Sequence, residues 1–107
     1  MRAAGIQTDN ARVTADPDLA ELRHAIDALD QRILDLLAER VRLVVRVGDV
    51  KRGRGLAVYD PERERVILDR LCAMATEPLD AATVRRIFER LIDESRRIEQ
   101  RHVAARR

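Results

Sequence analysis

The chain carries one long amphipathic pattern, and this pattern limits its possible folds more than any other feature. Apolar residues recur in steps of three and four, with a single gap, at Leu22, Ile26, Leu29, Ile33, Leu36, Leu43, Val47 and Val50. Such steps match the period of an α-helix and place these side chains on one face. The valine-rich stretch 41–50 is also compatible with a strand, but its charged residues keep the helical spacing. We therefore predict one continuous helix from Pro17 to Lys51.

Capping signals divide the chain into three predicted helices. Residues 16–18 and 60–62 each read Asp-Pro followed by an acid, which combines an N-cap with a proline at the first helical position. A shorter second helix is predicted from the second signal to about Thr76, and Asp80 caps a third helix. The sequence thus predicts an all-α fold whose first helix is much the longest.

Composition agrees with this fold class and excludes others. Aromatic residues make up 2% of the chain, with 4 glycines and 3 prolines, whereas a β-sandwich needs aromatic strands and frequent turn signals. The single cysteine, Cys72, has no intrachain disulfide partner, and with two separated histidines it offers too few ligands for a structural zinc site. We predict neither a metal nor a cofactor.

Acidic and basic residues alternate along the chain, 21 Lys and Arg against 19 Asp and Glu. This alternation is typical of solvated helix faces, so no nucleic-acid partner is expected, and the basic stretch from Arg96 onward is interpreted as a solvated helix end. No apolar run is long enough to cross a membrane, and residues 1–15 lack a signal-peptide core, which with a lone cysteine predicts a cytoplasmic location. We expect a flexible arm at 1–15, a helical domain at 16–104 and a basic tail at 105–107.

The first helix is too long for one small domain to cover. From Pro17 to Lys51 it would extend roughly 50 Å at a rise of about 1.5 Å per residue. A compact monomer of this size is only roughly 34 Å across. Two shorter helices cannot bury the whole apolar stripe, so we predict a homodimer in which the long helices pack against each other.

Four polar residues lie on stripes that otherwise belong to the core, and a fifth lies at the edge of one. At about 100° per residue, Arg40 and Lys51 fall at the centre of the first stripe, and Arg23 at its edge. On the third helix Ser95 and Glu99 fall within the apolar stripe. One interpretation is structural: Arg40 pairs with Glu99, or Lys51 extends its ammonium to solvent. Taken together, however, these residues favour a polar site that binds a small dicarboxylate by positioning and electrostatics.

These residues belong to a set of motifs that resembles the all-α chorismate mutases. The motifs are Leu22-Arg23, Ile26-Asp27, Leu29-Asp30, Leu36-Leu37-Ala38-Glu39-Arg40, Val47-Gly48 with Lys51, Asp60-Pro61-Glu62-Arg63-Glu64, and Asp93-Glu94-Ser95 with Glu99. The resemblance covers about residues 19–102 and implies an intertwined homodimer of three-helix protomers with two active sites. It also implies the Claisen rearrangement of chorismate to prephenate, with no covalent intermediate.

The resemblance implies a role for each candidate residue. Arg23 would reach in from the partner protomer, Arg40 would hold a substrate carboxylate, and Arg63 and Ser95 would complete carboxylate binding. Glu64, with the Asp60 region, would hold the ring hydroxyl.

The resemblance implies that two side chains act on the ether oxygen of chorismate, whose bond to carbon breaks in the reaction. Lys51 would donate to this oxygen and to a carboxylate, and Glu99 would face the oxygen from the opposite side. Many bacterial relatives carry Gln at this position and fungal relatives carry Glu. Because a carboxylate has no proton to donate, Glu99 must be protonated to help.

Three alternatives stay open. An isochorismate-pyruvate lyase shares the fold and the basic residues but tends to lack the acid at Glu64. A 4-amino-4-deoxychorismate mutase of an antibiotic pathway could use Asp60 and Glu64 to bind an ammonium. A non-catalytic dimeric helical module would keep its function after Arg40→Leu or Glu99→Leu, since apolar replacements of buried ions often stabilise a fold.

Overall fold

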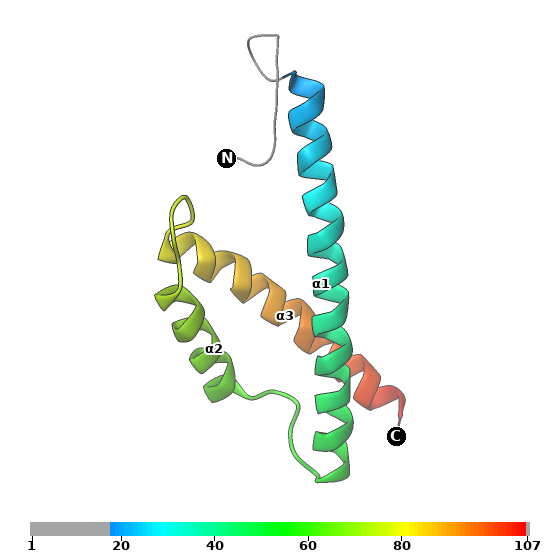
Figure 1. The fold of residues 1–107 in the computed structure, drawn as a ribbon. Helices are drawn as coiled ribbons and strands as arrows, with labels where there is room; N and C mark the ends of the chain where they lie inside the picture. Colours follow the sequence, from blue (N-terminus) through cyan, green and yellow to red (C-terminus); the bar gives the residue numbers. More distant parts are fainter. Residues whose placement is uncertain (1–17, 107) are drawn as a thin grey trace. The chain divides into compact units, whose positions relative to one another are not determined.

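The computed structural model describes residues 18–106 and contains three helices, α1 (Leu19–Gly53), α2 (Pro61–Ala73) and α3 (Ala81–Ala105) (Figure 1). No strand occurs within residues 18–106, so the predicted all-α class is confirmed. The predicted arm at 1–15 lies outside the described residues. Among the residues that are described, no helix is long and apolar enough to cross a membrane.

Helix α1 runs without a break through the valine-rich stretch 41–50, so the alternative of a strand there is wrong. The helix starts slightly later than predicted. Asp18 acts as the N-cap, since its Oδ1 accepts a hydrogen bond from the Ala20 amide at 3.0 Å. The predicted cap Asp16 and the predicted first residue Pro17 lie outside the described residues.

The end of α1 is closed by Gly55. This residue has φ 69°, a left-handed conformation that glycine adopts without a Cβ clash. The turn allows the Leu56 amide to donate to the Lys51 carbonyl at 2.8 Å and the Gly55 amide to donate to the Arg52 carbonyl at 3.2 Å. This pattern is a Schellman motif, and it turns the chain toward α2.

The second and third helices begin at the predicted acids. Asp60 Oδ1 accepts from the Arg63 amide at 3.1 Å, and Asp80 Oδ1 accepts from the Thr83 amide at 2.7 Å. The hydrogen bonds from Thr83 lower the pKa of Asp80, because they stabilise its ionised form. Helix α2 ends at Ala73, earlier than the predicted end near Thr76.

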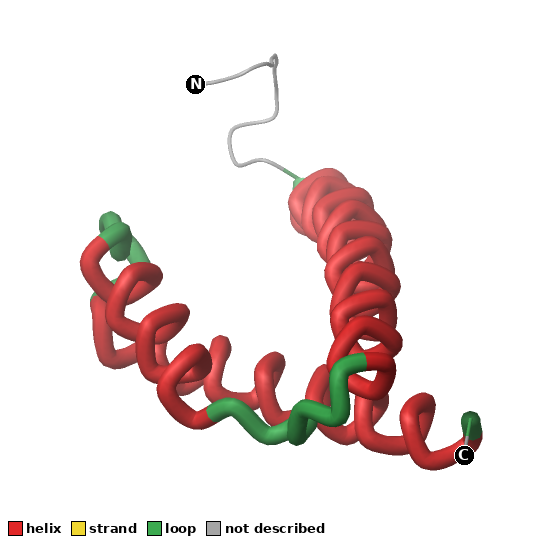
Figure 2. The backbone as a smooth tube through the Cα atoms, turned by 90° about the horizontal axis from the view of Figure 1, so that it is seen from below, coloured by secondary structure: helices red, strands yellow, loops and turns green. Residues whose placement is uncertain are grey.

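The described residues form two compact units, one with the first part of α1, up to Ala38, and one that starts at Glu39. Within the second unit, α2 packs beside α3 (Figure 2). The apolar core there is small, with only Val84 and Ile92 buried among the described hydrophobic residues.

The apolar stripe of α1 is exposed along its whole length. Its side chains are 48–62% exposed, at Leu22, Ile26, Leu29, Ile33, Leu36, Leu43, Val47 and Val50. A row of large apolar side chains this long is unusual on the surface of a monomer.

Candidate active site

The last part of α1 approaches α3 at a glycine. Gly48 is the one buried residue of α1. A Cβ at this position would lie 2.9 Å from Glu99 Cγ and 3.1 Å from Val103 Cγ2, which is closer than carbon atoms normally approach. The absence of a side chain therefore lets Glu99 lie directly against the α1 backbone. No role for Gly48 follows from its sequence position alone, but a glycine inside a long helix is unfavourable and usually has a packing reason.

Lys51 and Glu99 meet across the two helices. Lys51 Nζ lies 3.2 Å from Glu99 Oε2 and donates a hydrogen bond to the Val58 carbonyl at 2.7 Å. Glu99 is 5% exposed, and its Oε2 accepts no aligned hydrogen bond from the described residues. The pair thus joins a cation to a buried carboxyl oxygen that retains hydrogen-bonding capacity.

Arg40 contacts Ser95 and not Glu99. Its Nη1 donates to Ser95 Oγ at 2.8 Å, and the same hydroxyl donates to the Leu91 carbonyl at 2.7 Å. Burial lowers the pKa of Arg40, and the positive charge of Arg63 lowers it further. Within residues 18–106 no carboxylate forms an ion pair with this guanidinium, so it is suited to bind an anion.

The start of α2 supplies the remaining candidates. The carboxyl of Asp60 caps the helix through Oδ1, Arg63 is exposed and Glu64 is half-buried. Glu64 Oε2 lies 3.4 Å from Arg96 Nε. The interpretation of the basic stretch as a solvated helix end is therefore wrong at Arg96, whereas Arg97 and Arg101 are exposed. The Arg96 guanidinium also lies 5.1 Å from the centre of the Tyr59 ring.

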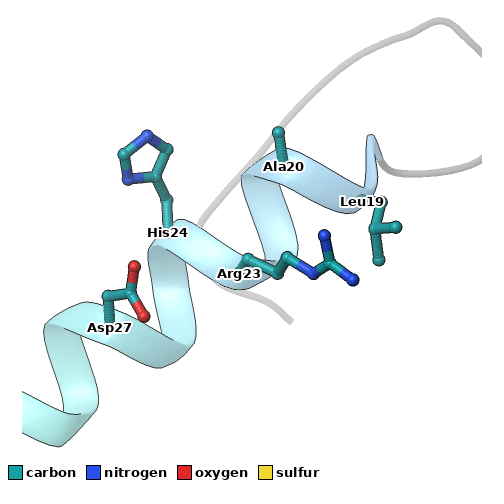
Figure 3. Close-up of a pocket in the computed structure, with 5 residues that line it drawn as sticks. All are labelled: Leu19, Ala20, Arg23, His24 and Asp27. Carbon is teal, nitrogen blue, oxygen red and sulfur yellow. The ribbon is translucent and has the colours of Figure 1, made fainter.

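Arg23 belongs to the first unit, which is described by itself. Its side chain is exposed on the first turns of α1. Figure 3 shows it beside a shallow depression, with its guanidinium on the same side of the helix as Leu19 and with His24 and Asp27 on the other side.

The second unit therefore places two cations of α1, Arg40 and Lys51, against a hydroxyl and a carboxyl of α3, Ser95 and Glu99. Arg40, which has no acidic partner among the described residues, can bind a carboxylate of a ligand. The Lys51 ammonium, paired with the Glu99 carboxyl, can stabilise negative charge on a ligand oxygen. The described residues contain no cluster of His, Cys, Asp or Glu able to hold a metal ion.

Comparisons with known proteins agree on one family. The sequence model of the family "Chorismate mutase type II" matches residues 22–100. The chain is 36% identical to the chorismate mutase of Methanocaldococcus jannaschii over 86 residues, which cover 79% of this chain and 87% of that protein. By contrast, the chain covers only 22% of the bifunctional chorismate mutase/prephenate dehydratase of Escherichia coli.

Solved structures show the same similarity. Chorismate mutase (form II) of Thermus thermophilus superposes with a TM-score of 0.75 at 36% identity, over 78% of this chain and 94% of that one. The Helicobacter pylori chorismate mutase, solved in complex with prephenate, gives a TM-score of 0.74 at 28% identity over 80% of this chain and 93% of that one.

Proposed function

The chain belongs to the chorismate mutase type II family, and we propose that it catalyses the rearrangement of chorismate to prephenate. The observation that carries this proposal is the Lys51–Glu99 pair, an ammonium 3.2 Å from a buried carboxyl oxygen. It lies in the same unit as Arg40, whose guanidinium has no acidic partner among residues 18–106. The H. pylori relative was solved with prephenate bound, which supports the same small dicarboxylate as the ligand here.

The reaction is unimolecular and needs no covalent intermediate with the enzyme. The enolpyruvyl group must swing over the ring before a C–C bond forms and the ether C–O bond breaks. In our proposal Arg40, with Ser95 and Arg63, binds substrate carboxylates and holds the substrate in this compact geometry. Such positioning removes part of the entropic barrier.

The ether oxygen becomes negative as its bond to carbon breaks. Lys51 donates to this oxygen from one side, and Glu99 faces it from the other, where its carboxyl can donate only in the protonated form. The Glu99 oxygen that accepts no aligned hydrogen bond from the described residues is suited to this role, since a protonated carboxyl there can donate to the substrate. Donors that are already in place need no reorganisation during the reaction.

Glu64, with the Asp60 region, is proposed to bind the ring hydroxyl. Because Asp60 Oδ1 caps α2, its other oxygen is the one that can face substrate. Glu64 lies one turn further along the same helix, so the cap sets the start of α2 and thereby the position of both acids.

We propose that two copies of the chain form the active enzyme. The exposed stripe of α1, 48–62% accessible at each of its apolar side chains, supports this proposal because a second copy would bury it. Arg23, at the edge of that stripe, would then enter the partner's site. Sedimentation at micromolar concentration tests this, and a folded monomer would contradict it. The cytoplasmic location and the domain limits at 16–104 stay predictions.

Product analysis tests the proposed activity. Purified protein is given chorismate, isochorismate and 4-amino-4-deoxychorismate in separate reactions, with loss of substrate followed by absorbance and products identified by chromatography. We expect prephenate from chorismate. Release of pyruvate from isochorismate without conversion of chorismate would favour the lyase, and no conversion of any substrate would favour a non-catalytic helical module.

A further inference from the structure

Arg96 joins three parts of the second unit. Its guanidinium lies 2.7 Å from Asp93 on its own helix and 3.4 Å from Glu64 on α2. It also lies over the ring of Tyr59, in the connection between α1 and α2, at 5.1 Å. The side chain is 21% exposed and that of Glu64 is 23% exposed, so both charges are partly withdrawn from water.

The neighbouring Arg97 shows what a purely local pair looks like on the same helix. Arg97 contacts Glu94 at 3.1 Å with the same spacing of three residues, but these side chains are 55% and 46% exposed. Such exposed pairs have little energetic effect. Arg96 differs because it is less exposed and also reaches an acid on another helix.

We propose that Arg96 is a positioning and specificity-determining residue, which makes the site prefer a cyclic dicarboxylate with a neutral ring hydroxyl over one with a ring ammonium. The inference rests on the proposed function, in which Glu64 binds the ring substituent. Arg96 fixes the carboxylate of Glu64 by a charge-assisted contact and offsets its negative charge.

The two ring substituents respond differently to this arrangement. A hydroxyl is neutral and can donate to a Glu64 oxygen while the guanidinium stays in place. An ammonium bound at the same oxygen would bring a second positive charge close to Arg96. Repulsion between like charges at partly buried positions then disfavours the amino substrate by about tenfold or more.

The test compares kcat/KM for chorismate and for 4-amino-4-deoxychorismate in the wild-type protein and in variants. Arg96→Gln removes the positive charge. We expect kcat/KM for the amino substrate, divided by kcat/KM for chorismate, to rise by about tenfold or more in this variant. Arg96→Lys keeps the charge and should keep a ratio close to that of the wild type. Arg97→Gln is the matched control, because it removes an exposed arginine from the next position and should leave the ratio unchanged.

A titratable substitution keeps the test informative if Arg96→Gln folds poorly. In Arg96→His the charge is lost as the pH rises through about 6.5. The preference for the amino substrate should then increase with pH more steeply in this variant than in the wild type. A merely structural role of Arg96 would not produce this difference between the two pH profiles.

Two results would overturn the inference. One is a ratio that is the same in the wild type, Arg96→Gln and Arg96→His at every pH, and the other is a wild-type preference for the amino substrate. Failure of the proposed function is a separate result, since a wild-type protein that does not convert chorismate refutes that function whatever the variants do.

Discussion

Replacing Gly48 by alanine tests whether close contact between α1 and α3 positions Glu99. The new Cβ would lie 2.9 Å from Glu99 Cγ and 3.1 Å from Val103 Cγ2, whereas ordinary contacts are 3.4–4 Å. Both neighbours belong to α3, so relief of the clash requires Glu99 to change its rotamer or the helices to separate by a few tenths of an ångström.

Two opposing terms set the effect on stability. Alanine is better than glycine inside a helix by about 1 kcal/mol. Overpacking of a tight contact costs about 1–3 kcal/mol. We therefore expect Gly48→Ala to lower the free energy of unfolding by about 0–2 kcal/mol.

The effect on activity should be larger than the effect on stability. Displacement of catalytic groups by about 1 Å can cost about a hundredfold in rate, so a shift of about half that size is expected to lower kcat/KM by about tenfold. The shift would lengthen the contact between Lys51 Nζ and Glu99 Oε2, which is 3.2 Å in the wild type.

Gly53→Ala is the matched control. It adds the same methyl group to the same helix, but apart from the adjoining residues and the nearby backbone of its own helix no atom lies within 4 Å of the new Cβ. This variant should be at least as stable as the wild type and fully active. Denaturant unfolding, at one fixed protein concentration because a dimer's stability depends on it, and steady-state kinetics with chorismate provide both measurements.

The double variant Gly48→Ala/Val103→Ala separates the two contacts. It removes the contact at 3.1 Å and leaves the one with Glu99, so activity should stay low even where stability partly recovers. A Gly48→Ala variant as stable and as active as Gly53→Ala would show that this close contact does not position Glu99.

Two further predictions concern charged residues. Arg40→Leu should still fold but should lower kcat/KM by about a hundredfold or more, as for the loss of a key donor. Arg42 is exposed, so Arg42→Leu should stay active as the control. Equal activity in the two variants would contradict a role of Arg40 in substrate binding. Because the pKa of Asp80 is lowered in the folded protein, its stabilising effect is present above the unfolded pKa and is lost as the pH falls through the folded one. Thermal unfolding should therefore respond more to acidification from about pH 5 to about pH 2 in the wild type than in Asp80→Asn, and identical responses would contradict this account.

The helices could be predicted from local patterns along the chain. A period of three to four residues needs only the spacing of apolar residues, and a cap needs only an acid a few residues before the amide that it accepts from. Asp60 and Asp80 therefore cap their helices as predicted. At the start of α1 two acids flank Pro17, so the local pattern does not choose between them, and the cap described by the structure is the second, Asp18.

The sequence was enough to predict which residues form the candidate site, but not which of them contact each other. Angular position on a helix was enough to single out Arg40, Lys51, Ser95 and Glu99 as polar residues on apolar stripes. Which cation meets which partner depends on how α3 is placed along α1, and sequence spacing within each helix does not specify this. The structure pairs Arg40 with Ser95 and Lys51 with Glu99, instead of Arg40 with Glu99.

Gly48 and Arg96 show why tertiary contacts were needed. In the sequence Gly48 is an unfavourable helix residue, and its use becomes evident only where Glu99 and Val103 fill the space that a Cβ would take. In the sequence Arg96 resembles its neighbour Arg97, since each has an acid three residues earlier. Only the packing of α2 against α3 brings Glu64 to Arg96, because contacts between distant residues depend on how the helices pack and not on the period within either one.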